Sequence, residues 1–224
     1  MAEENWTAVD ALFEDLLIPS DPALDAALRA SADAGLPPIQ VAPNQGKLLN
    51  LLARAIGARN ILEVGTLGGY STIWLARAVP EGGRVTTLEI DPAHAEVAQA
   101  SIDRAGVSDR VTIRVGRALE TLPELEAQRR GPFDLTFIDA DKQSTADYFT
   151  WAVRLSRRGS LIIVDNVVRR GEILDTSSSD PMVQGMLRFN TALAAEPRVD
   201  AAVLQTVGVK GHDGWAVALV TAEI

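Results

Sequence analysis

NILEVGTLGGYS, residues 60–71, is the stretch of sequence that decides the fold. Its first five residues are mostly apolar and predict a strand, which runs directly into a glycine-rich turn and the start of a helix. A strand, a glycine-rich turn and a helix form the general nucleotide-binding arrangement of open parallel sheets. The stretch therefore predicts an α/β fold with a ligand site beside the glycine turn.

The alternation of strand and helix continues along the chain, as expected of parallel βαβ units. We expect five parallel strands, at residues 60–64, 84–90, 111–115, 133–138 and 160–164. Helical patterns lie between them at residues 69–79, 92–105, 117–128 and 143–156. A further helix is expected to begin at Asp180 and Pro181, because proline is favoured at the first helical position. Two last strands, 200–207 and 214–221, predict an antiparallel hairpin that closes the sheet.

Three helical segments are expected before the first strand, at residues 3–17, 21–34 and 43–56. The sequence contains no linker, repeat or low-complexity tract, so we expect a single domain over residues 1–224. Its parts would be a helical extension (1–42) and a core (43–224). The core is expected to be an α/β, Rossmann-like, doubly wound sheet of seven strands, five of them parallel and two in the hairpin. Pattern alone does not separate this fold from other doubly wound folds.

The composition restricts the function. The chain has 224 residues, 47% hydrophobic and 23% charged, with a net charge of −9, which disfavours a nucleic-acid partner. It has no cysteine and two histidines, so a zinc site is not expected. Neither His94 nor His212 has an evident partner. No apolar run could span a membrane and the acidic N-terminus is unlike a signal peptide, so we expect a cytoplasmic protein with a small-molecule substrate.

The glycine turn departs from the dinucleotide fingerprint G-x-G-x-x-G. When the last two glycines of the fingerprint are set on Gly65 and Gly68, Glu63 stands where the first should be. A carboxylate there would oppose a pyrophosphate and suit a positively charged ligand. S-adenosylmethionine carries a sulfonium and an ammonium group and no phosphate, so the turn favours it over NAD. The structural alternative is a glycine-rich turn with an incidental glutamate.

The next two strand ends add candidates for the same ligand. An acidic residue about 20 positions beyond the glycine turn usually holds a ribose, and Glu89 and Asp91 compete for this role. Asp91 precedes Pro92, a pair typical of a helix N-cap, which leaves Glu89 for the ribose. The third strand ends in VGRAL, a loop placed to border an adenine. We expect backbone groups near Ala118 to recognise that base.

The motifs FIDADK and IIVDNVV end the fourth and fifth strands. If these strands are neighbours, their ends lie roughly 5–10 Å apart, and Asp139, Asp165 and Asn166 present three oxygen donors to one point. Oxygen donors alone select Mg²⁺, Ca²⁺ or Mn²⁺ over zinc or copper. The structural alternatives are Asp141 as a helix cap and Asp165-Asn166 as a turn. Three donors at adjacent strand ends, with Lys142 beside them, favour a site.

Five blocks of the sequence resemble one family: APNQGKLL, ILEVGTLGGYSTIWLA, FDLTFIDADK, IIVDNVV and QTVGVKGHDGWAVA. They span most of the chain from residue 42 onward. By these blocks the sequence resembles the class I S-adenosylmethionine-dependent O-methyltransferases of the metal-dependent caffeoyl-CoA and catechol group, and most closely the small bacterial members. Five parallel strands and a hairpin are the sheet expected of a Rossmann-like methyltransferase. The first forty residues match less distinctly.

The resemblance implies roles for individual residues. It places eight residues around S-adenosylmethionine: Val41, Glu63, Gly65, Thr66, Ser71, Glu89, Ala118 and Asp141. It assigns Asp139, Asp165 and Asn166 to a divalent cation, Mg²⁺ first, with Ca²⁺ or Mn²⁺ as alternatives. Lys142, together with Asp139, is expected to be catalytic beside the reacting oxygen. Arg170 stands where plant members have a substrate-contacting asparagine, so their acceptors are not carried over.

The implied reaction moves a methyl group to one hydroxyl of a vicinal diphenol such as a catechol- or caffeoyl-type phenol. We expect Lys142 to act first as a fixed positive charge that stabilises the phenolate, and second as a base. The alternatives are a non-catalytic S-adenosylmethionine-binding protein and an NAD(P)-dependent reductase. The set of metal ligands argues against the first. Glu63 and the lack of a Tyr-x-x-x-Lys pair argue against the second.

The N-terminal helix carries an apolar stripe, composed of Trp6, Val9, Leu12, Phe13, Leu16 and Leu17. Such a stripe is exposed to water unless another surface covers it. As family members suggest, we expect the stripe to pack across a two-fold homodimer or to cover the active site.

Overall fold

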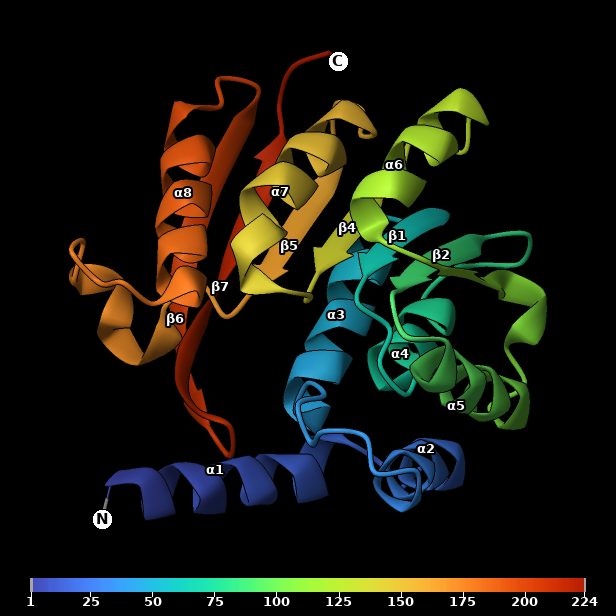
Figure 1. The fold of residues 1–224 in the computed structure, drawn as a ribbon. Coiled ribbons are helices and arrows are strands. Elements are labelled where there is room, and N and C mark those ends of the chain that lie inside the picture. The colour runs from blue at the N-terminus through green and yellow to red at the C-terminus, as the bar shows by residue number, and fades with distance from the viewer. Residues whose placement is uncertain (1, 224) are drawn as a thin grey trace.

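A computed structural model describes residues 2–223, with a seven-stranded sheet at the centre (Figure 1). The strands are β1 (Asn60–Val64), β2 (Arg84–Glu89), β3 (Val111–Val115), β4 (Leu135–Ile138), β5 (Leu161–Asp165), β6 (Val199–Gly208) and β7 (Gly211–Val220). Their order is β3-β2-β1-β4-β5-β7-β6. β1 to β5 are parallel, and β7 runs antiparallel to both β5 and β6. The predicted fold class is confirmed. The ends of the predicted domain, Met1 and Ile224, lie outside the described residues.

Helices cover both faces of the sheet (Figure 1). The α-helices are α1 (Ala2–Leu17), α2 (Pro22–Asp33), α3 (Pro43–Ala55), α4 (Tyr70–Ala76), α5 (Pro92–Arg104), α6 (Ala118–Ala127), α7 (Thr145–Arg154) and α8 (Pro181–Ala195). Three 3₁₀ turns are η1 (Ser108–Arg110), η2 (Lys142–Ser144) and η3 (Arg169–Leu174). One buried apolar cluster joins the sheet to α3, α4 and α5, and a second joins it to α6, α7 and α8. Strands such as β1 contribute to both clusters, as expected of a parallel sheet.

Aspartate–proline pairs begin three of the helices. Asp21, Asp91 and Asp180 accept hydrogen bonds from backbone N–H groups of the first turn, and proline follows each of them. The carboxylate satisfies N–H groups that have no partner inside the helix, and proline has no N–H to satisfy. The caps predicted at Asp91 and Asp180 are therefore confirmed.

Two predicted boundaries differ from the structure in ways that concern named residues. The strand predicted from residue 133 begins at Leu135, and just before it the Asp134 carboxylate accepts hydrogen bonds from the backbone N–H groups of Arg59 and Asn60. The hairpin turn is also shorter than expected, since β6 reaches Gly208 and β7 starts at Gly211. His212 is therefore in a strand, where its ring lies 2.9 Å from the Gln205 side-chain oxygen. The expectation that His212 lacks a partner was wrong.

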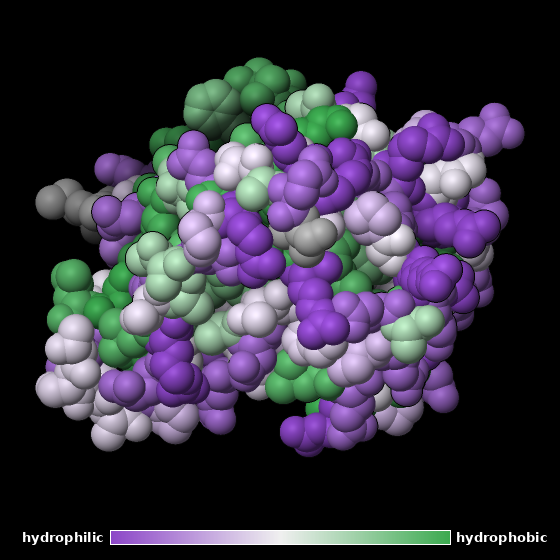
Figure 2. Space-filling view, turned by 90° about the horizontal axis from the view of Figure 1, so that it is seen from above, coloured by the Kyte–Doolittle hydropathy of each residue, from purple (hydrophilic) through white to green (hydrophobic). Residues whose placement is uncertain are grey.

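Helix α1 lies across the tip of the β6–β7 hairpin (Figure 1), where the Asp10 carboxylate accepts a 2.7 Å hydrogen bond from the Val209 N–H. Five residues of its predicted apolar stripe are 47–66% exposed: Val9, Leu12, Phe13, Leu16 and Leu17. The opposite side of the molecule is mostly hydrophilic, as the view from above shows (Figure 2). Among the described residues, no helix is long and apolar enough to cross a membrane.

Candidate functional site

The glycine turn after β1 lies directly against the end of β4. Gly65 has a φ of +102°, and a Cβ atom at this position would lie 2.0 Å from the backbone carbonyl oxygen of Asp139. Both the positive φ and the close approach require glycine. The turn and the first acidic residue of FIDADK are therefore fixed beside each other by the backbone alone.

Glu63 lies behind this turn and has no exposed surface. Its two carboxylate oxygens accept hydrogen bonds from the hydroxyl groups of Ser71 at 2.6 Å, Thr72 at 2.5 Å and Thr87 at 2.7 Å. Burial raises its pKa to about 7, although the three hydroxyl donors act in the opposite direction. Glu63 thus joins β1, β2 and the start of α4. It does not line the cavity next to the turn, so the structure places it behind the expected cofactor site.

Glu89 supports the same turn from the end of β2. One carboxylate oxygen accepts hydrogen bonds from the N–H groups of Thr66 at 3.2 Å and Leu67 at 2.8 Å, and the other from Asp91 at 3.0 Å. The ring of His94 lies 3.7 Å from that second oxygen. The first turn of α5 thus brings His94 toward β2, at a distance longer than a hydrogen bond.

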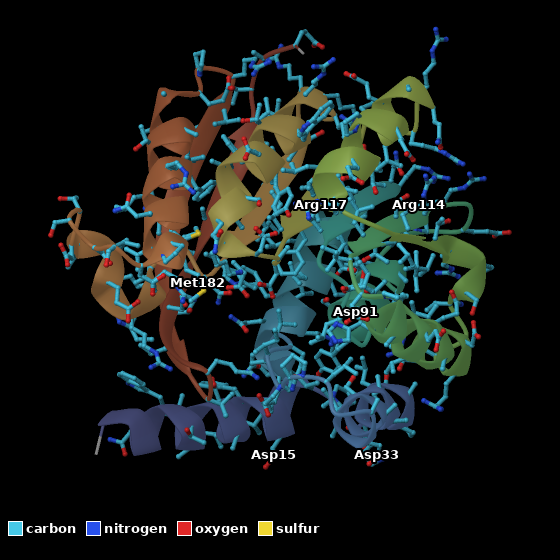
Figure 3. All side chains as sticks on the ribbon, viewed as in Figure 1. Asp15, Asp33, Asp91, Arg114, Arg117 and Met182 are labelled. Atoms are coloured by element: carbon cyan, nitrogen blue, oxygen red, sulfur yellow. The ribbon has the colours of Figure 1, made fainter. Side chains whose placement is uncertain are left out.

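A cavity of about 780 Å³ opens at the carboxyl ends of the strands. Seven of the eight predicted cofactor residues line it, all except Glu63: Val41, Gly65, Thr66, Ser71, Glu89, Ala118 and Asp141. Its walls come from distant parts of the chain, as the labelled positions of Asp91, Arg117 and Met182 show (Figure 3). We call this space the first cavity.

A second cavity, of about 710 Å³, adjoins the first. Its walls are formed by α1, the segment 38–48, η3 and the tip of the β6–β7 hairpin. Asn166 and Arg169 line both cavities, Asp139 and Lys142 line the first, and Asp165 lines the second. The predicted metal ligands and Lys142 therefore lie where the two cavities meet.

Two carboxylates meet at this boundary because β4 and β5 are paired neighbours. Asp165 is 4% exposed, and its pKa is raised by burial and by the charge of Asp139, against the opposing effect of Lys142. The Lys142 ammonium lies 2.8 Å from Asp139 Oδ1. Asn166 has a left-handed backbone, φ +62°, and its N–H donates to Asp165 Oδ1 at 2.7 Å.

These residues fit a hard divalent cation. Burial and repulsion between carboxylates disfavour the ionised form of Asp165, and a cation between the two groups would remove that penalty. Within residues 2–223, no group of three or more His, Asp and Glu side chains could hold a metal. The expected donor set, Asp139, Asp165 and Asn166, has only two carboxylates and one amide oxygen.

Asp141 caps the helical turn that follows it, as in the structural alternative to a role in ligand binding. Its Oδ2 accepts a 3.0 Å hydrogen bond from the Ser144 N–H, and its Oδ1 accepts a 2.5 Å bond from the Tyr148 hydroxyl. Burial opposes ionisation of this carboxyl, yet these hydrogen bonds hold its pKa below the usual value. Asp141 also lines the first cavity, so the cap leaves it beside the expected cofactor. The sequence offered no signal for Tyr148.

Two further residues that the sequence analysis did not select position the site. Asp213 of β7 accepts hydrogen bonds at Oδ1 from the N–H groups of Val168 and Arg169, each at 3.0 Å, and so holds the turn after Asn166. On α8, a Cβ atom at Gly185 would lie 2.1 Å from the Lys142 carbonyl oxygen. Gly185 thus lets α8 support the backbone of Lys142. Asp213 lies in the quoted block QTVGVKGHDGWAVA, but strand-end rules do not select it.

Comparison with known proteins gives consistent matches over nearly the whole chain. The family model described as O-methyltransferase matches residues 19–215. A catechol O-methyltransferase of Niastella koreensis is 55% identical over 98% of this chain and 100% of its own. The solved structure of an O-methyltransferase from Bacillus cereus in complex with SAH has a TM-score of 0.96 and 56% identity, over 97% of this chain and 99% of that one. TomG, an O-methyltransferase from Streptomyces achromogenes involved in tomaymycin synthesis and solved with SAM, has a TM-score of 0.96 and 48% identity, over 99% and 100%.

The raised pKa of Glu63 gives a pH-dependent prediction. Between about pH 4.5 and about pH 7 the folded chain keeps a proton that the unfolded chain has released, so the free energy of unfolding falls as pH rises through this window. Glu63→Gln removes this contribution. Between about pH 4.5 and about pH 7 we therefore expect the free energy of unfolding of the variant to rise relative to that of the wild type, by at most about 3 kcal/mol. Urea unfolding without cofactor, from about pH 5 to about pH 8, measures the difference. Glu120→Gln, at a side chain that is 73% exposed, is the control; parallel pH profiles for wild type and Glu63→Gln would contradict the prediction.

Proposed function

The chain belongs to the O-methyltransferase family, and from this premise we propose that it methylates one hydroxyl of a vicinal diphenol with the help of a divalent cation. It is a class I S-adenosylmethionine-dependent O-methyltransferase of the caffeoyl-CoA and catechol type. The observation that carries the finer proposal is the meeting of two cavities at Asp139, Asp165, Asn166 and Lys142. One cavity suits the methyl donor and the other the acceptor.

The first cavity suits S-adenosylmethionine. Gly65, Thr66 and Ser71 provide the turn against which its methionine part would lie, and Asp141 provides a carboxylate for the ammonium group. Glu89 would hold the ribose and the backbone at Ala118 the adenine. TomG and the Bacillus cereus protein, which share this fold, were solved with SAM and SAH.

The carboxylates of Asp139 and Asp165 and the amide oxygen of Asn166 would hold the cation, Mg²⁺ first and Ca²⁺ or Mn²⁺ as alternatives. When bound, such an ion supplies Lewis acidity, which lowers the pKa of a phenol and fixes two adjacent hydroxyls. Asp165 is buried at the end of a strand that is paired on both sides, so its carboxylate has little freedom to move. The backbone of Asn166 is held by its hydrogen bond to Asp165.

Lys142 stabilises the reacting oxygen. Its side chain is 10% exposed, and its ammonium group is held 2.8 Å from Asp139 at the boundary of the cavities. In the transfer the phenolate oxygen attacks the methyl carbon from the side opposite sulfur. The O–CH₃ bond forms while the S–CH₃ bond breaks, and its electron pair returns to sulfur to leave S-adenosylhomocysteine. A positive charge fixed beside the oxygen favours the phenolate over the phenol, whose proton leaves to solvent, so that more of the bound acceptor is in the reactive form.

Methyl transfer to a panel of vicinal diphenols tests the proposed function. We expect turnover with S-adenosylmethionine and Mg²⁺, loss of turnover when EDTA removes the ion, and none with the corresponding monophenols, because chelation needs two adjacent hydroxyls. Product formation is followed by chromatography and mass spectrometry. Turnover that is unaffected by EDTA would contradict the metal dependence and leave the methyltransferase assignment in place.

Substitution of Lys142 tests its role as a fixed charge. We expect Lys142→Ala to lower kcat by about 100-fold, because loss of the positive charge raises the pKa of the bound phenol and leaves less of it ionised. Lys142→Arg should keep most of the activity, since arginine stays protonated and supplies the same charge. Single-turnover rates over a range of pH measure both variants. Equal losses in the two would contradict the fixed charge and favour proton abstraction by Lys142, and full turnover of Lys142→Ala would exclude both roles.

We also propose that the chain is a homodimer that buries the apolar stripe of α1. The stripe is exposed in a single chain, and a contiguous apolar patch on the surface of a folded chain indicates a protein–protein interface. Leu16→Glu, at its most exposed leucine, should therefore shift the sedimentation coefficient from that of a dimer to that of a monomer. Leu174→Glu, which changes an 86% exposed leucine of η3, is the control. A wild type that sediments as a monomer would overturn the proposal.

A further inference from the structure

The second cavity has an unusual distribution of charge for an acidic protein. Arg169, Arg170 and Lys210 line it, and among the described residues none of the three forms an ion pair with a carboxylate. Within residues 2–223, the Lys210 ammonium donates to the backbone oxygen of Pro38, at 2.8 Å, and to no other group. The buried Nε of Arg169 has no hydrogen-bond partner in the same part of the chain.

The acidic residues of the same cavity are nearly all occupied. The Asp10 carboxylate accepts from the Val209 N–H, Asp213 accepts from backbone N–H groups, and Asp165 belongs to the expected metal site. Glu172 is the exception among the described residues that line the cavity, with no side-chain partner. Accepting a hydrogen bond leaves a carboxylate charged, but within residues 2–223 none of these carboxylates forms an ion pair with Arg169, Arg170 or Lys210.

The backbone that carries the two arginines is held in an unfavourable conformation. Arg169 and Arg170 have φ values of +51° and +55°, in the left-handed region that residues other than glycine rarely adopt. Asp213 maintains this turn by accepting from the N–H groups of Val168 and Arg169. Strained backbone of this kind concentrates at functional sites, where surrounding contacts hold it in place.

We propose that Arg170, with Arg169 and Lys210, binds a carboxylate on the acceptor, so that the enzyme prefers vicinal diphenols carrying an anionic substituent. This inference rests on the proposed function, because it places the diphenol at the metal site and its substituent in the second cavity. A guanidinium group matches a carboxylate through two parallel hydrogen bonds. Anchoring the far end of the ring also fixes which of the two hydroxyls faces the methyl donor.

A matched pair of acceptors tests the proposal: 3,4-dihydroxybenzoate and its uncharged isostere 3,4-dihydroxybenzamide. Both present the same diphenol, and the amide withdraws more electron density, so easier ionisation cannot explain a preference for the benzoate. We expect kcat/KM to be about tenfold higher for the benzoate than for the benzamide, mostly because KM is lower. A factor of this size corresponds to one charge-assisted hydrogen bond that the benzamide lacks. The preference should decrease as salt concentration rises.

Three variants test which residues cause the preference for the benzoate over the benzamide. Arg170→Asn should reduce the benzoate-to-benzamide ratio about tenfold, and asparagine tolerates the left-handed backbone better than other residues, so the charge is the main change. Glu172→Gln removes a carboxylate from the same wall and should raise the ratio. Arg54→Gln removes one charge outside both cavities and should leave the ratio unchanged.

Calorimetric titration of each acceptor into the protein with Mg²⁺ and S-adenosylhomocysteine separates this inference from the proposed function, because it needs no turnover. Tighter binding of the benzoate that is lost in Arg170→Asn supports the inference, even if no methyl transfer is found. Equal affinities for benzoate and benzamide overturn it, even if both are methylated. A wild-type preference that Arg170→Asn leaves intact also overturns it.

Discussion

The contact between Gly65 and the carbonyl oxygen of Asp139 is the constraint on which the site depends. A Cβ atom would have to lie 2.0 Å from that oxygen, so the turn after β1 and the end of β4 can touch only where there is no side chain. This contact fixes the first cavity against the strand end that supplies Asp139. β4 then fixes Asp165 through its pairing with β5, and the position of Asn166 follows from that of Asp165. The strand ends that border the two cavities are thus placed relative to each other by strand pairing and one backbone contact.

Carboxylates, two of them buried, hold the loops around this centre. Glu63 binds three hydroxyl groups, Glu89 binds the N–H groups of the glycine turn, and Asp213 binds those of the turn after Asn166. Each accepts hydrogen bonds from several donors at once, and a carboxylate is the side chain with enough lone pairs to do so. The cost of burying the charge is visible at Glu63, whose pKa rises to about 7 even with three donors. The protein accepts this cost where a loop must be held in a conformation that its own sequence does not favour.

The sequence predicted what depends on local signals. The alternation of strands and helices, the hairpin and the caps at Asp91 and Asp180 follow from apolar periodicity and from aspartate–proline pairs, and seven of the eight expected cofactor residues do line one cavity. It could not predict that Glu63 binds three hydroxyl groups and does not line the cavity, because one of these groups, that of Thr87, comes from another strand. Nor could it select Asp213 or Gly185, whose effects on Arg169 and Lys142 arise only when distant segments pack together. His212 shows the same limit, since its contact with Gln205 is set by the register of the hairpin.

Loop-supporting carboxylates and cationic side chains lie together at the second cavity. The chain has a net charge of −9, yet among the described residues Arg169, Arg170 and Lys210 form no ion pair at the second cavity. There Asp10 and Asp213 accept hydrogen bonds from backbone N–H groups and hold the loops that form the wall. Unpaired cations at the wall of a cavity attract anions from solution. The loop supports and the unpaired cations therefore belong to the same wall, where the backbone that carries the cations is held by the carboxylates.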